Sequence, residues 1–71
     1  MTGYEYRIIT TRAFGTVYAE CDVKIATAWS IERLIEDGTW DSTDIIPFYD
    51  EEHKWEVLQD ARKMVFEYQS G

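Results

Sequence analysis

Apolar and polar residues alternate along the first third of the chain. Residues 4–8 switch at every step between an aromatic or aliphatic side chain and a charged one. From residue 16 to 25 the odd positions are aliphatic or cysteine, and the even positions are Thr, Tyr or charged. A period of two is typical of a half-buried strand, and Gly15 can adopt the positive φ that a tight connection needs. The pattern predicts an antiparallel β-hairpin over about 4–11 and 15–26.

A helix is expected after the hairpin. Thr27 is a suitable N-cap, and Gly38 stands where helix C-termini favour glycine. The apolar positions between them follow helical spacing and are Ala28, Ile31, Leu34 and Ile35. The pattern predicts a short helix over about 28–37, with Trp29 on another side. For the end of the second strand, the alternative is a helix that is capped by Asp22 and starts at Val23, which would leave Ile25 outside the apolar arc.

The last segment is predicted to be the longest helix, about 49–68. Its first turn is acidic, which suits the positive end of the helix dipole. Six apolar positions fall within about 120° of arc, and they are Val57, Leu58, Ala61, Met64, Val65 and Tyr68. A hairpin over 55–59 and 63–68 is the alternative, but the segment is rich in helix formers. Residues 39–48, rich in Asp, Ser and Thr, are expected to form an irregular connector.

These elements predict a single α+β domain over residues 1–71, in which the hairpin packs against both helices. A chain of 71 residues builds only a modest core. Its one cysteine, Cys21, excludes an intramolecular disulfide. Three Trp, five Tyr and three Phe compensate, because each buried ring removes roughly 150–250 Å² from water.

The sequence indicates a cytoplasmic protein. A lone cysteine fits a reducing compartment. No apolar run approaches the ~20 residues that a membrane helix needs, and residues 1–7 lack the features of a signal peptide. We therefore expect no membrane partner.

The net charge of −7 is concentrated in one half of the chain. Residues 1–31 hold three acids and three bases, whereas residues 32–71 hold eleven acids and four bases. Between residues 34 and 53 there are seven acids and no Lys or Arg. This excess argues against direct nucleic-acid binding, which requires Lys and Arg at the phosphates.

Four aromatic residues of the predicted hairpin are candidates for stacking on nucleic-acid bases. They are Tyr4, Tyr6, Phe14 and Tyr18. Because the three bases of this region are matched by three acids, we assign the rings to structural packing.

Candidate metal sites are incomplete. Asp50, His53 and Glu56 share helical spacing, but zinc sites want four ligands, mostly Cys and His. Three aspartates between residues 37 and 44 do not match the spacing of a calcium loop. We therefore expect no metal and no other cofactor.

Catalysis is also not expected. A Cys21–His53 pair would need a third group to orient the base, and Cys21 falls among the inward residues of its strand. Acid pairs are too abundant for any one to be singled out, and there is no glycine-rich phosphate loop. A chain this short has little room for an enclosed catalytic pocket.

The acidic segment 36–52 is the strongest functional candidate. Carboxylates along a turn and a helix start can occupy the sites where a partner's Arg and Lys would meet phosphates, and its aromatic residues can serve as anchors. The expected contact residues are Glu36, Asp37, Trp40, Asp41, Asp44, Tyr49, Asp50, Glu51 and Glu52. The simpler alternative is a solvated face that only keeps the protein soluble.

In size, charge and lack of chemical motifs, the chain resembles small acidic inhibitors that bacteriophages encode, including anti-CRISPR proteins and other blockers of host nucleic-acid enzymes. The resemblance implies a non-enzymatic inhibitor, or DNA mimic, that binds a basic protein surface in a bacterial host. The alternative function is a structural or regulatory homodimer. It would assemble through an aromatic strip of Phe48, Trp55 and Phe66 beside the apolar face of the last helix.

Overall fold

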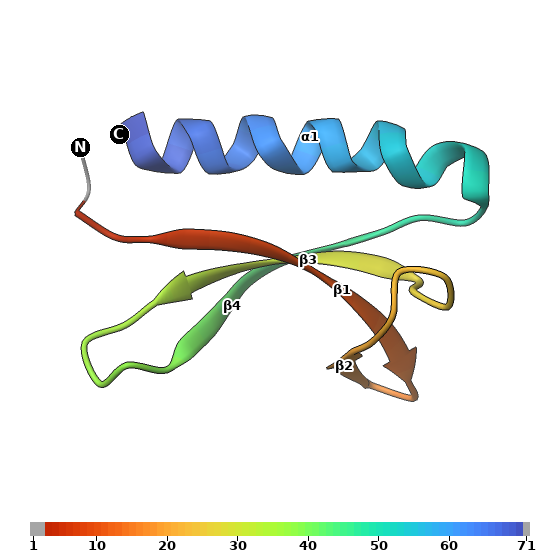
Figure 1. Ribbon diagram of the computed structural model, residues 1–71, viewed down its shortest axis with the longest axis horizontal. Coiled ribbons are helices and arrows are strands. Elements are labelled where there is room, and N and C mark those ends of the chain that lie inside the picture. Colours follow the sequence, from red (N-terminus) through yellow and green to blue (C-terminus); the bar gives the residue numbers. More distant parts are fainter. Residues whose placement is uncertain (1–2, 71) are drawn as a thin grey trace.

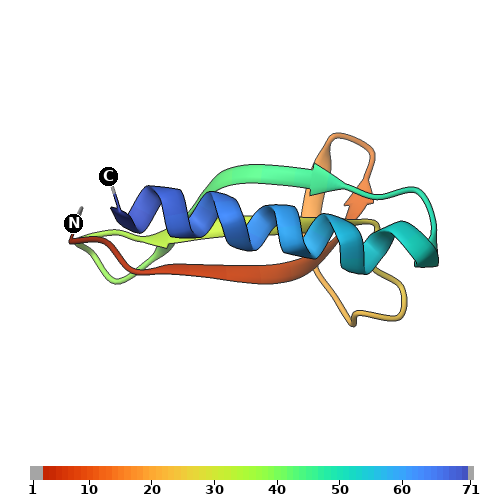
Figure 2. The same ribbon diagram turned by 90° about the horizontal axis from the view of Figure 1, so that it is seen from above.

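Residues 3–70 form four antiparallel strands and one helix, which confirms the α+β class. The computed structural model describes residues 3–70, so part of the N-terminal segment examined for a signal peptide lies outside the described residues. The elements in chain order are β1 (Tyr6–Phe14), β2 (Val17–Glu20), β3 (Ala28–Leu34), β4 (Trp40–Pro47) and α1 (Glu51–Ser70). The strands form a single sheet in the order β2-β1-β3-β4, and α1 lies along one face of it (Figures 1 and 2).

The predicted hairpin is present, but its second strand is shorter than expected. β1 and β2 pair around Gly15, whose φ is +64°. The chain leaves the sheet after Glu20, because the Asp22 side chain accepts a hydrogen bond from the Lys24 amide at 2.9 Å and bends the backbone. Residues 21–27 are therefore a loop, so both the extension of the strand to 26 and the alternative helix are wrong.

The short helix predicted over 28–37 is wrong, because this segment forms β3 and the turn after it. β3 pairs with β1 on one side and β4 on the other, so hydrogen bonding to both neighbours outweighs a weak helical pattern. Gly38, with a φ of +86°, belongs to the β3–β4 turn. Trp29, which the helical pattern placed off the apolar face, lies in the core.

The connector predicted over 39–48 is instead the edge strand β4. It contains a β-bulge: Ile31 is paired with Asp44 and Glu32 with Ser42, so Thr43 has no partner residue on β3. The bulge changes which face each later side chain points to. Pro47 is tolerated at the end of this strand because an edge strand has no outer neighbour.

Helix α1 confirms the longest helix and excludes the alternative hairpin. Asp50 caps it, accepting a hydrogen bond from the His53 amide at 2.8 Å. The six predicted apolar positions are all buried or half-buried, Ala61 fully so, and the one other residue of the helix that is buried is Lys54. This helix is not long and apolar enough to cross a membrane, and no other helix occurs in residues 3–70.

Trp29 organises the core between the sheet and the helix. Its ring lies 5.9 Å from the rings of both Phe48 and Trp55. Its indole N–H donates to the Lys54 carbonyl at 2.8 Å, which fixes the register of the helix on the sheet. Cys21 is half-buried and packs against this cluster.

Candidate functional site

The fold arranges the predicted acidic residues in a row along the edge strand rather than in one compact patch. Glu36 and Asp37 lie in the β3–β4 turn, and Asp50 to Glu52 lie at the start of α1. β4 separates these two groups, and its eight residues span about 25 Å at ~3.3 Å per residue. Figure 1 shows β4 running from the turn toward the start of the helix.

Two of the predicted contact residues hold the fold together. Asp44 points toward the helix and accepts a hydrogen bond from the Tyr68 hydroxyl at 2.6 Å. This bond is the main reason that the pKa of Tyr68 is raised above its ordinary value. Asp37 accepts bonds from the hydroxyl and the amide of Thr39 at 2.6 and 2.9 Å, which close the turn and lower the pKa of its carboxyl.

The other predicted contact acids form few ion pairs within the described residues. Within residues 3–70, Glu51 is the one acid between 36 and 52 that pairs with a Lys or Arg, at 2.9 Å from Lys54. Glu36, Asp41 and Glu52 are exposed and form no ion pair with any other described residue. Three of these acids therefore present carboxylates without an ion-pair partner among residues 3–70, whereas Asp50 pairs with His53 and Glu51 with Lys54. All the predicted contact acids except Asp44 are exposed. We call these six residues (Glu36, Asp37, Asp41, Asp50, Glu51 and Glu52) the acidic row.

The aromatic residues predicted as anchors differ in availability. Tyr49 is 92% exposed at the junction of β4 and α1. Trp40 is half-buried, and the Arg7 guanidinium lies over its ring at 4.2 Å from the centroid. Tyr49 is therefore the residue of the pair that a partner can reach without rearrangement.

The proposed self-association strip is broken in the structure. Phe48 precedes the helix and is only 7% exposed, because it packs on Trp29 in the core. Including it in an exposed strip was wrong. Trp55 and Phe66 remain 51% and 70% exposed on α1. Trp55 also contacts Trp29.

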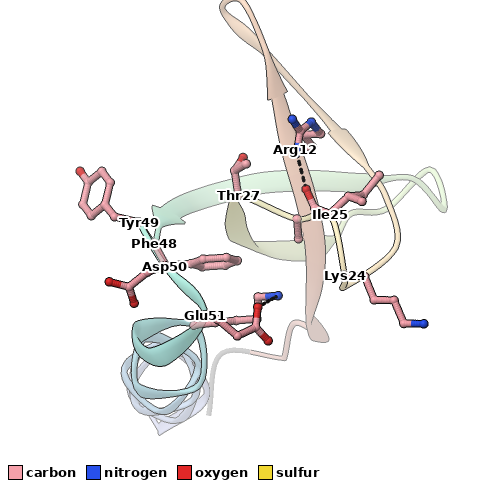
Figure 3. Close-up of a pocket in the computed structure, with 10 residues that line it drawn as sticks. Arg12, Lys24, Ile25, Thr27, Phe48, Tyr49, Asp50 and Glu51 are labelled. Atoms are coloured by element: carbon pink, nitrogen blue, oxygen red, sulfur yellow. Dashed lines mark hydrogen bonds and ion pairs between the residues drawn. The ribbon is translucent and has the colours of Figure 1, made fainter.

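Sequence reasoning missed a buried lysine at the start of the helix. Lys54 is 3% exposed, and its ammonium donates to the Val23 carbonyl at 2.8 Å while pairing with Glu51. The signal was available, since position 54 falls in the middle of the apolar arc when 100° per residue is applied. Figure 3 shows this region, a cavity of about 300 Å³ between the helix start and the loop before β3.

That cavity carries both signs of charge. Its lining includes Arg12 and Lys24 as well as Asp50 and Glu51. Arg12 is held by a hydrogen bond of 2.7 Å to the Ile25 carbonyl, drawn as a dashed line in Figure 3. Neither Cys nor His lines the cavity.

The other sequence candidates are not assembled into sites in the described part of the chain. Cys21 and His53 share no hydrogen bond among residues 3–70, and these residues contain no group of three or more His, Cys, Asp or Glu placed to hold a metal ion. His53 instead pairs with Asp50, with Nδ1 2.7 Å from the carboxylate oxygen. Glu56 lies farther, at 4.0 Å from Nε2.

The Asp50–His53 pair gives a testable titration. The hydrogen bond and then the charge of Asp50 raise the pKa of His53 above 6.5, while bonds from His53 lower the pKa of Asp50. We expect the ring protons of His53 to titrate above that value in NMR. Asp50→Asn should return the midpoint toward it, because asparagine still caps the helix but carries no charge.

The sign of the stability effect follows from the direction of the shift. A raised pKa means that the folded state binds the His53 proton more tightly, so this stabilisation is present below about pH 6.5 and disappears as the pH rises through the higher folded value. An unchanged midpoint in Asp50→Asn would contradict the pairing.

Comparison with known proteins gives no match: no protein-family model, no curated protein sequence and no solved structure matches the chain. Its function is therefore inferred from its own residues, of which the acidic row is the most distinctive group.

Proposed function

We propose that this chain is a non-enzymatic binding protein whose acidic row occupies a basic, nucleic-acid-binding surface of a partner protein. The observation that supports the proposal is the small number of ion pairs along the row: within residues 3–70, Glu51 pairs with Lys54 and Asp50 with His53, and the other acids of the row pair with no cation. Exposed carboxylates form strong charge-assisted hydrogen bonds with Arg and Lys. A partner that uses such groups to bind phosphates would meet a matching pattern here.

The position of the row suits this role. Asp41 lies on the edge strand and the other acids lie in the turn before it and at the start of the helix after it, so the fold sets the backbone positions of all six before a partner arrives. Tyr49, at the helix end of the row, supplies an exposed aromatic side chain. The long-range field of seven net negative charges would also speed encounter with a basic surface.

The resemblance in size and charge to phage-encoded inhibitors extends the proposal to a class of partner. In this reading the protein acts in the cytoplasm of a bacterial host. It blocks a nucleic-acid enzyme or complex as anti-CRISPR proteins and DNA mimics do, and its own chain does not touch nucleic acid.

Charge reversal on the row tests the proposal. The triple variant Glu36→Lys, Asp41→Lys and Glu52→Lys changes three exposed acids that form no ion pair within residues 3–70, so the fold should persist. We expect binding to a partner captured from a bacterial lysate to weaken by at least ~100-fold, since each charge-assisted bond is worth about 1.5–3 kcal/mol. Affinity of the unmodified protein should also fall as salt is added. Calorimetry measures both effects.

A matched control separates the row from net charge. Glu5→Lys, Asp60→Lys and Glu67→Lys produce the same change in charge at exposed positions outside the row. This control should lose far less affinity than the row variant. Equal losses in the two variants would mean that only total charge matters, and no loss in the row variant would refute the proposed surface.

A further inference from the structure

No helix among residues 3–70 lies on the face of the sheet opposite α1, although Thr11 and Ser30 on that face are buried by their neighbours. Figures 1 and 2 show the helix on one side only. The uncovered side forms a hollow of about 260 Å³ with small side chains such as Ser30 and Ser42 in its lining and Ile9, Tyr18 and Ile45 around them. Tyr18 and Ile45 are among the exposed large apolar residues of the chain. We call this surface, defined by the residues that line the hollow, the open face.

The open face is also nearly neutral. Its charged lining residues are Arg7, Glu20 and Glu32, which sum to 1 − 2 = −1. Arg7 and Glu32 neutralise each other through an ion pair of 2.6 Å. Because the whole chain carries −7, the remaining negative charge lies elsewhere. Two copies brought together by their open faces would therefore meet with little repulsion at the contact.

Other routes to self-association are less favourable. The β4 edge carries Asp41, the bulge at Thr43 and Pro47, all of which oppose pairing with another strand. The β2 edge is only four residues long. Helix α1 exposes Trp55 and Phe66 but contains five acids against three bases, so two copies of its outer side would repel.

The footprint of the molecule on the side of the open face limits the size of an interface there. The helix and the sheet are stacked along the intermediate axis in Figure 1, so the whole molecule extends 34 × 18 Å along the other two axes. This footprint of roughly 600 Å² is an upper limit on the flat area of the open face, and it falls at the lower end of the ~600–1,000 Å² that each partner buries in a standard interface. A domain of this length also gains stability from association, because its own core is small.

We propose that two copies of this chain associate through their open faces as a twofold symmetric dimer. Tyr18 and Ile45 of each copy pack against the other copy, and the Arg7–Glu32 pairs are enclosed already neutralised. The acidic rows stay outside the contact, so the dimer presents two of them. The proposal does not depend on the proposed inhibitor function.

Sedimentation of the unmodified protein and two matched variants tests the dimer. We expect the unmodified chain to dimerise with a dissociation constant of about 1 µM or lower. Ile45→Lys should be monomeric at the same concentration, because it places two cations in the contact. Phe66→Lys adds the same charge on the helix and should remain dimeric. A monomer at ~100 µM, or a dimer that only Phe66→Lys dissociates, would overturn the proposal.

Two further measurements keep the test decisive if Ile45→Lys does not fold. Tyr18→Lys changes the same face from the other edge strand and should also dissociate the dimer. NMR of the unmodified chain over a dilution series needs no substitution, and its shifts should change at Ile9, Tyr18 and Ile45. Changes confined to Trp55 and Phe66 would assign the contact to the helix and refute the open face.

Salt distinguishes this proposal from the proposed function. Added salt should tighten the dimer, because it screens repulsion between two chains of −7. The same salt should weaken binding of a basic partner. If salt does not tighten the dimer, the open-face proposal has failed. If salt does not weaken binding of the basic partner, the proposed function has failed.

Discussion

Trp29→Ala is expected to remove a large share of the protein's stability. The substitution removes the ring that contacts both Phe48 and Trp55, and it also removes the donor to the Lys54 carbonyl. Loss of a buried aromatic side chain costs about 3–5 kcal/mol. A chain of this length has a total stability of only about 4–10 kcal/mol. Urea unfolding followed by far-ultraviolet circular dichroism measures the change.

Two companion variants test why the effect is large. Trp55→Ala removes a ring of the same size that is 51% exposed, so it should cost much less. Trp29→Phe keeps an aromatic ring and loses the N–H donor, with an expected cost of about 1–3 kcal/mol. If Trp29→Ala and Trp55→Ala were equally destabilising, the core would not be centred on Trp29.

The residues of the C-terminal half show what a periodic pattern can predict. The helix was predictable because its apolar residues recur at helical spacing over more than three turns. A strand would require a period of two instead. The same arc contains position 54, where the lysine is buried for geometric reasons. The pattern identified the face, but residue type suggested the wrong environment for Lys54.

The central strand could not be predicted from local pattern alone. In β3, the residues that face the helix are Trp29 and Ile31, and Ser30 between them is also buried because it lies in the floor of the open face. A strand buried on both faces does not show a clear period of two. Its pairing with β1 and β4 is non-local, and four apolar residues at helical spacing gave a stronger local signal.

The candidate site was predicted in composition but not in arrangement. The sequence identified which acids lack nearby bases, and the structure keeps most of them exposed. The sequence could not show that the Asp44 side chain points inward to Tyr68, because its direction depends on the bulge at Thr43. The open face was also inaccessible to sequence reasoning, since its residues come from all four strands.

Lys54→Glu is expected to destabilise the protein by about 3–5 kcal/mol, the cost of leaving a buried charge without a partner. The new carboxylate would lie beside the Glu51 carboxylate and the Val23 carbonyl, which in the unmodified protein pair with and accept a hydrogen bond from the Lys54 ammonium, respectively. Its favourable interaction with the helix N-terminus is worth only about 0.3–1 kcal/mol. Thermal and urea unfolding should both show the loss, which should become smaller at low pH, where the new carboxyl is protonated.

Lys54→Met provides the matched control for the charge. Methionine fills much of the space of the lysine stem and still packs against Phe48, but it leaves the Val23 carbonyl without its donor. We expect a cost of about 1–2 kcal/mol, because Glu51 is exposed enough to be hydrated when its partner is removed. The difference between the two variants measures the electrostatic contribution of the ammonium. Equal destabilisation by glutamate and methionine would show that the lysine acts through packing alone.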